Sequence, residues 1–171
     1  MAHNDPTISW TLDRAALVKR DVEATIDLKT GERRTWGDTR RRVHGVASAL
    51  NAMGLDRGDR VGVLMLNSAR HFELWFAIPA AGLVMNDLNY RLAAEELRFI
   101  CNDSGVKVLF VDDTYLDVAH QLRTIVPSLE TIVWVGVGTE GPDDLPAYDT
   151  LAATEPIALP DAASDLANCC F

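Results

Sequence analysis

The fold is decided by residues 61–88, which read VGVLMLNSARHFELWFAIPAAGLVMNDL. Residues 61–66 form a continuous apolar run, as expected for a strand that is buried on both faces. Asn67 or Ser68 can cap the helix that follows, and residues 83–88 predict a second strand. A strand, a helix and a strand in this order are typical of a parallel sheet with a helical crossover.

The same alternation continues toward higher residue numbers. Residues 94–104 predict a helix that stops at Gly105, and residues 106–111 predict the third strand. Residues 115–125 predict another helix, and residues 131–137, rich in Ile, Val and Trp, predict the fourth strand. Four strands joined by three helical crossovers predict one parallel sheet with right-handed connections.

Upstream of this unit, residues 23–36 predict a β-hairpin. A helix of about 17 residues follows, with Thr35 as its N-cap, Asp38 three residues later and Gly54 as its stop. Residues 1–22 form a separate N-terminal segment in this interpretation. The fold class is therefore α/β, a parallel Rossmann-like sheet flanked by helices with a small N-terminal β-hairpin.

Composition places the chain among ordinary globular proteins. It has 171 residues, a formal net charge of −9, 48% apolar and 24% charged residues. The longest apolar run, residues 74–85, contains Pro79 and is shorter than the roughly 20 residues that span a bilayer. Because its three cysteines follow no pattern, and because we expect no signal peptide and no transmembrane segment, the sequence predicts a cytoplasmic protein.

Charge is distributed unevenly along the chain. Residues 1–123 hold all 16 Lys and Arg, whereas residues 124–171 hold eight acids and no base. This imbalance argues against a nucleic-acid partner. One basic cluster consists of Arg33, Arg34, Arg40, Arg41 and Arg42. It could bind phosphate or form a solvated helix face, and the lack of interleaved aromatic residues favours the solvated helix face.

Two motifs resemble known sites without completing them. GVGTEG at residues 136–141 matches G-x-G-x-x-G, but PDDLP follows where a dinucleotide site needs the start of a helix, so we expect a flexible loop. Asp112 and Asp113 follow a strand as in a phosphoacceptor site, but the last lysine is Lys107, so we expect a turn that caps a helix. We expect no metal site, because the four histidines are scattered.

The aromatic residues Phe72, Trp75 and Phe76 could line an acyl pocket. Their helical spacing favours the simpler hypothesis that they form the core-facing stripe of their helix. No complete set of catalytic residues is found in the sequence.

Six short segments stand in a specific order: TWG at 35–37, GLDRGDRVGV at 54–63, LNS at 66–68, LNYRL at 88–92, AEEL at 94–97 and VLFVD at 108–112. In order and spacing they resemble the N-terminal part of the AMP-forming acyl-CoA synthetases, and most closely the fatty-acyl branch. The resemblance covers residues 23–137, and residues 165–171 look like the strand that leads into the nucleotide loop of that family.

The resemblance implies a ligase that converts a carboxylate to an acyl-adenylate and then to an acyl-CoA. A fatty acid is the expected substrate. The full-length enzyme would use ATP, Mg²⁺ and coenzyme A, with a small-molecule carboxylate as substrate. In the family the nucleotide loop and the catalytic lysine come later in the chain. Residues 23–171 are thus expected to be an incomplete N-terminal subdomain, that is, a partial AMP-binding domain truncated before the nucleotide loop. We expect this part alone to bind none of these ligands tightly and to be inactive.

The resemblance carries one binding residue over to this sequence. Arg91 stands where some members of the family contact the nucleotide of coenzyme A, which would make it a phosphate ligand; the alternative is a solvated or helix-capping arginine. The sequence departs from the fatty-acyl pattern close by, with Asn86-Asp87 in place of His-Thr and Tyr90 in place of Pro.

Two alternatives from other functional classes stay open. The chain could be a free-standing Rossmann-like module that binds a nucleotide or an acyl carrier without catalysis. It could also be an interaction domain that self-associates through uncovered surfaces, because an unpaired sheet edge favours association.

Overall fold

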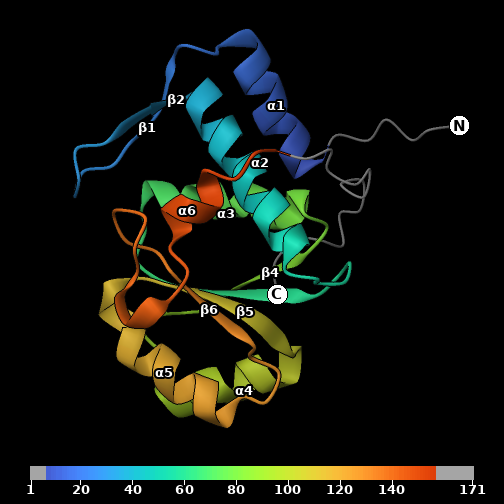
Figure 1. Cartoon of the computed structure of the whole chain (residues 1–171), viewed down its shortest axis with the longest axis vertical. Helices are drawn as coiled ribbons and strands as arrows, with labels where there is room; N and C mark the ends of the chain where they lie inside the picture. Colours follow the sequence, from blue (N-terminus) through green and yellow to red (C-terminus); the bar gives the residue numbers. More distant parts are fainter. Residues whose placement is uncertain (1–6, 157–171) are drawn as a thin grey trace, which may run out of the picture.

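The computed structural model describes residues 7–156, except for the side chain of Asp144. Its centre is a parallel sheet in the order β4-β3-β5-β6 (Figure 1). The strands are β3 (Arg60–Leu64), β4 (Val84–Asp87), β5 (Val106–Val111) and β6 (Thr131–Trp134). The predicted parallel sheet is confirmed, with β3 and β6 ending a few residues before the apolar runs do.

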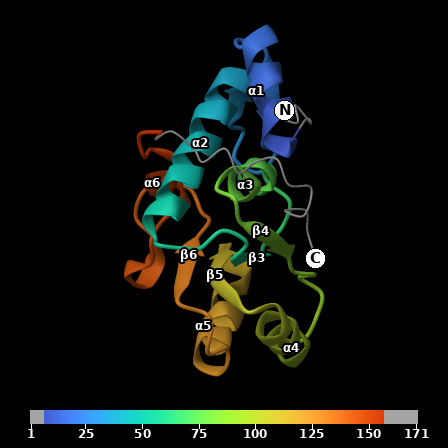
Figure 2. The ribbon, with the colours of Figure 1, turned by 90° about the vertical axis from the view of Figure 1, so that its right-hand side faces the viewer.

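Helices cover both faces of the sheet, which gives three layers (Figures 1 and 2). One face carries α2 (Trp36–Ala52), α3 (Ala69–Ala80) and the short α6 (Tyr148–Ala152), and the other carries α4 (Ala94–Ser104) and α5 (Leu116–Ile125). Successive strand residues point to opposite layers: Val61 and Val63 join the core under α2 and α3, and Leu64 joins the core over α4. Both faces of each strand are therefore buried, which explains the continuous apolar runs.

Local capping explains where several elements begin and end. Thr35 Oγ1 accepts a hydrogen bond from Asp38 N at 3.1 Å, and Asp38 Oδ2 accepts one from Thr35 N at 3.4 Å, so the expected capping box opens α2. Gly105 ends α4 in the left-handed conformation with φ 66°. The sequence predicted both the capping box at Thr35 and the end of α4 at Gly105.

The hairpin of β1 (Glu23–Ile26) and β2 (Arg33–Thr35) is attached to α3 by Asp27. One oxygen of its carboxylate accepts hydrogen bonds from Lys29 N and Thr30 N in the turn, and the other accepts one from Ala69 N at 3.2 Å. Burial alone would raise the pKa of Asp27, but these backbone donors stabilise the carboxylate and lower the pKa. One side chain thus shapes the hairpin and caps α3.

The first helix, α1 (Ile8–Val18), lies in a part of the chain for which the sequence analysis predicted no element. It packs against α2 and α3, and buries Leu12 and Ala16. Among the described residues no helix is long and apolar enough to cross a membrane. Residues 165–171, expected to form a strand, lie outside the described residues.

The predicted core stripe of α3 is confirmed at Phe76, which packs against the core, but is wrong for Trp75 and Phe72. Trp75 is 41% exposed, and Phe72 and Phe76 are half-buried and meet edge to face with ring centroids 5.1 Å apart. The core is also contacted by Leu74, Ala77 and Ile78. Because α3 is apolar on most of its circumference, its hydrophobic periodicity does not identify the buried side.

At Gly45, helix α2 packs closely against the backbone at the end of α6. A Cβ atom at Gly45 would lie 2.5 Å from the carbonyl oxygen of Ala152, which is backbone and cannot move aside without displacing the end of α6. We expect Gly45→Ala to lower the free energy of unfolding by about 1–3 kcal/mol in urea denaturation. The control is Gly37→Ala in the same helix, whose Cβ would lie 2.9 Å from Arg20 Cγ and 3.2 Å from the Arg20 carbonyl oxygen, so the expected loss is smaller. A loss of stability in the control as large as in Gly45→Ala would contradict this account.

Candidate functional site

The carboxyl ends of the strands form the edge at which open α/β sheets bind ligands, and Arg91 lies there, four residues after the end of β4. Its backbone N–H donates to Asn89 Oδ1 at 3.1 Å, which forms a tight turn. Its exposed guanidinium lies 5.2 Å from the ring centre of Tyr90 and makes no ion pair with another described residue. The structure therefore leaves this cation available to an anionic ligand.

The three positions that depart from the fatty-acyl pattern have defined contacts. Asn86 donates to Ser104 Oγ at 2.8 Å, which ties β4 to the end of α4. Asp87 lies 3.2 Å from His71 Nε2, which ties β4 to α3. Tyr90 stacks under Arg91 and lies 6.1 Å from the ring of Tyr115.

At the switch point between β3 and β5, Asp112 bridges the ends of the two strands. Its carboxylate accepts hydrogen bonds from Leu66 N at 2.9 Å and from Thr114 N at 3.0 Å, and the neighbouring Asp113 accepts one from the indole of Trp134 at 2.6 Å. The predicted capping turn is confirmed. No group of three or more possible metal ligands occurs among the described residues.

The glycine motif at residues 136–141 is a loop, as expected. It is followed by a short 3₁₀ turn, Pro142–Asp144, and not by an α-helix whose amides could meet a pyrophosphate. The central glycine, Gly138, has φ 113° and donates its N–H to Asp149 Oδ2 at 3.0 Å. The amide that would contact a phosphate is thus used inside the protein.

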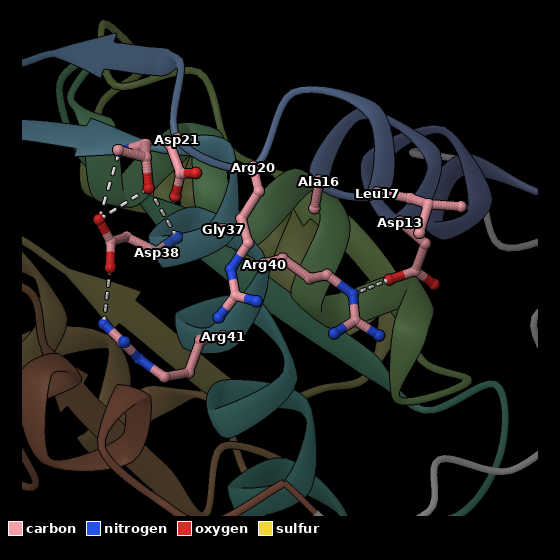
Figure 3. Close-up of a pocket in the computed structure, with 10 residues that line it drawn as sticks. Asp13, Ala16, Leu17, Arg20, Asp21, Gly37, Asp38, Arg40 and Arg41 are labelled. Carbon is pink, nitrogen blue, oxygen red and sulfur yellow. Dashed lines mark hydrogen bonds and ion pairs between the residues drawn. The ribbon is translucent and has the colours of Figure 1, made fainter.

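A cleft of about 890 Å³ lies between α1 and the first turns of α2. Figure 3 shows residues that line it. Three exposed arginines line it, and two of them pair with an acid: Arg40 with Asp13 at 2.6 Å and Arg41 with Asp38 at 3.0 Å. The Arg20 side chain runs past Gly37 into the same cleft. Acids interleave with the arginines, so the prediction of a solvated helix face holds for these two members of the basic cluster.

For two other members the prediction is wrong: Arg34 is buried, and the side chain of Arg42 is only 16% exposed. Arg42 Nε donates to both oxygens of Glu73, at 3.0 and 3.1 Å, and its Nη2 donates to Asp149 Oδ1 at 2.7 Å. Arg34 lies 3.6 Å from Glu73 and donates to Glu32 at 2.8 Å. These residues belong to an ionic network inside the α2, α3 and α6 layer.

The network is completed by two further residues. Arg70 donates to Asp149 through Nε and Nη2, at 3.2 and 2.8 Å, and to Glu32 through Nη1 at 3.1 Å. The fully buried Tyr148 hydroxyl donates to Glu73 Oε2 at 2.8 Å. The sequence analysis missed this network. Its one visible signal was Glu73, a single acid inside an apolar helix, which needs buried cationic partners.

The network shifts the pKa values of Asp149, Tyr148 and Arg42. Burial opposes charge on Asp149, but hydrogen bonds from Arg70, Arg42 and Gly138 N outweigh it and lower the pKa of Asp149 to about 2. Burial and the adjacent Glu73 carboxylate raise the pKa of Tyr148 well above its usual value. Burial also opposes charge on Arg42, yet Glu73 and Asp149 raise its pKa. All these groups therefore keep one charge state at neutral pH.

Comparison with known proteins shows the family to which the chain belongs. A family model described as "AMP-binding enzyme" matches residues 12–171. The chain belongs to the AMP-binding enzyme family. The long-chain-fatty-acid–CoA ligase of Thermus thermophilus is 31% identical over 157 residues, which cover 90% of this chain and 29% of that protein. The long-chain-fatty-acid–CoA ligase FadD13 of Mycobacterium tuberculosis is 32% identical over 130 residues, 75% of this chain and 26% of that protein.

Solved structures agree with this membership of the AMP-binding enzyme family. The N-terminal domain of FACL13 from Mycobacterium tuberculosis superposes with a TM-score of 0.76 and 27% identity, over 91% of this chain and 38% of that one. The expected resemblance and fold class are therefore confirmed. The chain spans less than a third of the length of the curated relatives described above.

The pKa of Asp149 predicts how stability depends on acid. A carboxyl whose pKa is about 2 when folded and about 3.9 when unfolded stabilises the fold above pH 4, and this contribution is lost as the pH falls toward 2. Between about pH 5 and pH 2 the wild-type chain should lose about 2 kcal/mol more stability than Asp149→Asn. Urea denaturation at each pH measures this, with Asp103→Asn, an exposed carboxylate on α4, as the control. Parallel curves for wild type and Asp149→Asn would contradict the assignment.

Proposed function

We propose that this chain is the N-terminal part of an ATP-dependent, AMP-forming acyl-CoA ligase of the cytoplasm, acting on a fatty acid. The family match over residues 12–171 carries the proposal. It is supported by relatives named as long-chain and medium-chain fatty-acid–CoA ligases. Residues that hold ATP would then lie in sequence beyond these 171 residues, so that the described part is scaffold and one wall of the site.

The described residues fit ATP and Mg²⁺ poorly. They contain no cluster of possible metal ligands, and the amide of Gly138 is bonded to Asp149. No step at the α-phosphate is therefore assigned to them. In the full-length enzyme, ATP would supply the adenylate that activates the carboxylate.

A phosphate of coenzyme A fits Arg91 better. The guanidinium is exposed at the carboxyl edge of the sheet and free of ion pairs within the described part of the chain, and its backbone is fixed by the Asn89 turn. An arginine can bind phosphate with two parallel charge-assisted hydrogen bonds. In this role Arg91 orients the coenzyme and takes no part in bond making.

The proposal is tested by measuring acyl-CoA formation and pyrophosphate release from ATP, Mg²⁺, a fatty acid and coenzyme A. We expect turnover with a full-length protein that carries these residues and none with the 171-residue chain. Full-length protein without turnover on carboxylates would overturn the proposal. A 171-residue chain that is stabilised by a nucleotide or an acyl carrier, without turnover, would favour a free-standing binding module.

The role of Arg91 is tested in the full-length protein. Arg91→Ala should raise KM for coenzyme A about tenfold, the loss of one charge-assisted contact, with KM for ATP unchanged. The matched control is Arg98→Ala, which removes an exposed arginine paired with Glu95 on α4. Equal effects of the two substitutions on KM for coenzyme A would show that Arg91 makes no specific contact.

A further inference from the structure

Helix α1 carries apolar side chains on two sides. Leu12 and Ala16 are buried where the helix packs against α2 and α3. Trp10, Leu17 and Val18, at the helical spacing i, i+7 and i+8, lie on the outer side and are 49%, 82% and 65% exposed. A surface helix normally keeps polar residues on its outer side, so this second apolar stripe, the α1 ridge, favours an apolar partner.

The surroundings of the α1 ridge are cationic, although the chain has a net charge of −9. Arg14 lies within the ridge, with its guanidinium 5.7 Å from the ring centre of Trp10. Lys19 and Arg20 follow the helix directly. These three residues, the α1 cations, are exposed and make no ion pair with another described residue. The one acid between residues 7 and 20, Asp13, pairs with an arginine of α2 at 2.6 Å.

Two hollows flank the α1 ridge. One is the cleft of Figure 3, which Arg20 and Leu17 line together. The other is a groove of about 380 Å³ whose lining includes Val18, Lys19 and Trp36. An apolar ridge with cations on both flanks matches a surface in which acyl chains lie beneath anionic headgroups. Tryptophan beside arginine or lysine is typical of helices at such an interface.

We propose that α1 lies on an anionic lipid bilayer, with the α1 ridge among the headgroups and the α1 cations against their phosphates. Charge complementarity favours a bilayer over a second copy of the chain. A symmetric dimer centred on this face would bring the α1 cations of two copies together, which opposes association. The contact is peripheral, because no described helix is long and apolar enough to cross a membrane.

Co-sedimentation with vesicles of phosphatidylcholine, with and without phosphatidylserine, tests the role of charge. We expect the 171-residue chain to bind only vesicles that contain phosphatidylserine, and high salt to release it. Each cation at an anionic surface raises affinity about fivefold, so Arg14→Ala with Lys19→Ala should weaken binding about 25-fold. The matched control is Arg98→Ala with Arg123→Ala, two exposed cations on α4 and α5. An equal loss in the control would overturn the proposal.

A second pair of variants tests the apolar contact. Leu17→Glu should weaken vesicle binding about tenfold, because it places a carboxylate among the headgroups. Phe99→Glu makes the same change in charge at a side chain that is 67% exposed on α4, at the opposite end of the molecule (Figure 1), and should leave binding unchanged. Urea denaturation of both variants checks that they fold. Equal vesicle binding by the two folded variants would contradict the proposal.

Three results would assign the α1 ridge to another occupant and so overturn the proposal. Vesicle binding by residues 1–156 but not by the 171-residue chain would show that residues 157–171 cover it. Binding by the 171-residue chain but not by the full-length protein would show that the remainder covers it. A dimer that Leu17→Glu dissociates, without vesicle binding, would assign it to a second copy. Binding is measured without ATP or coenzyme A, so its outcome is independent of the ligase assay.

Discussion

The fully buried carboxylate of Glu73 is the constraint on which the α2, α3 and α6 layer depends. Removing a carboxylate from water costs several kcal/mol unless donors replace the lost hydration. The donors here come from two elements, Arg42 on α2 and Tyr148 on α6, and the positive charge of Arg34 on β2 lies 3.6 Å away. Glu73 therefore meets its donors where α2 and α6 pack against α3. The network therefore specifies how the layer packs more than it adds net stability.

The short helix α6 shows this dependence most clearly. Five residues are too few for a helix to be stable in isolation, so α6 must be held by tertiary contacts. Tyr148 and Asp149 supply them by joining Glu73, Arg42 and Arg70, and Asp149 also accepts the N–H of Gly138. The glycine loop is thus attached to the same network, which explains why a G-x-G-x-x-G sequence here forms an internal contact and not a phosphate site.

The parts of the fold that could be predicted from sequence are those with local causes. The capping box at Thr35, the left-handed stop at Gly105 and the turn at Asp112 each depend on a few adjacent residues. The buried side of α3 and the burial of Arg42 depend instead on distant residues. Arg40, Arg41 and Arg42 are identical in type and consecutive, yet only Arg42 faces Glu73, which no local pattern reveals. The candidate site was predicted only through family resemblance, since Arg91 carries no signal of its own.

The position of Arg91 links the candidate site to the open edge of the sheet. Asp112 bridges the ends of β3 and β5, so the switch point that usually receives a ligand is occupied by a protein group. The exposed cation lies instead after β4, the strand at the open edge. In the described part of the chain Arg91 is exposed, so water screens its charge. Less solvent around its guanidinium would strengthen its attraction for a phosphate, because screening by water falls with burial.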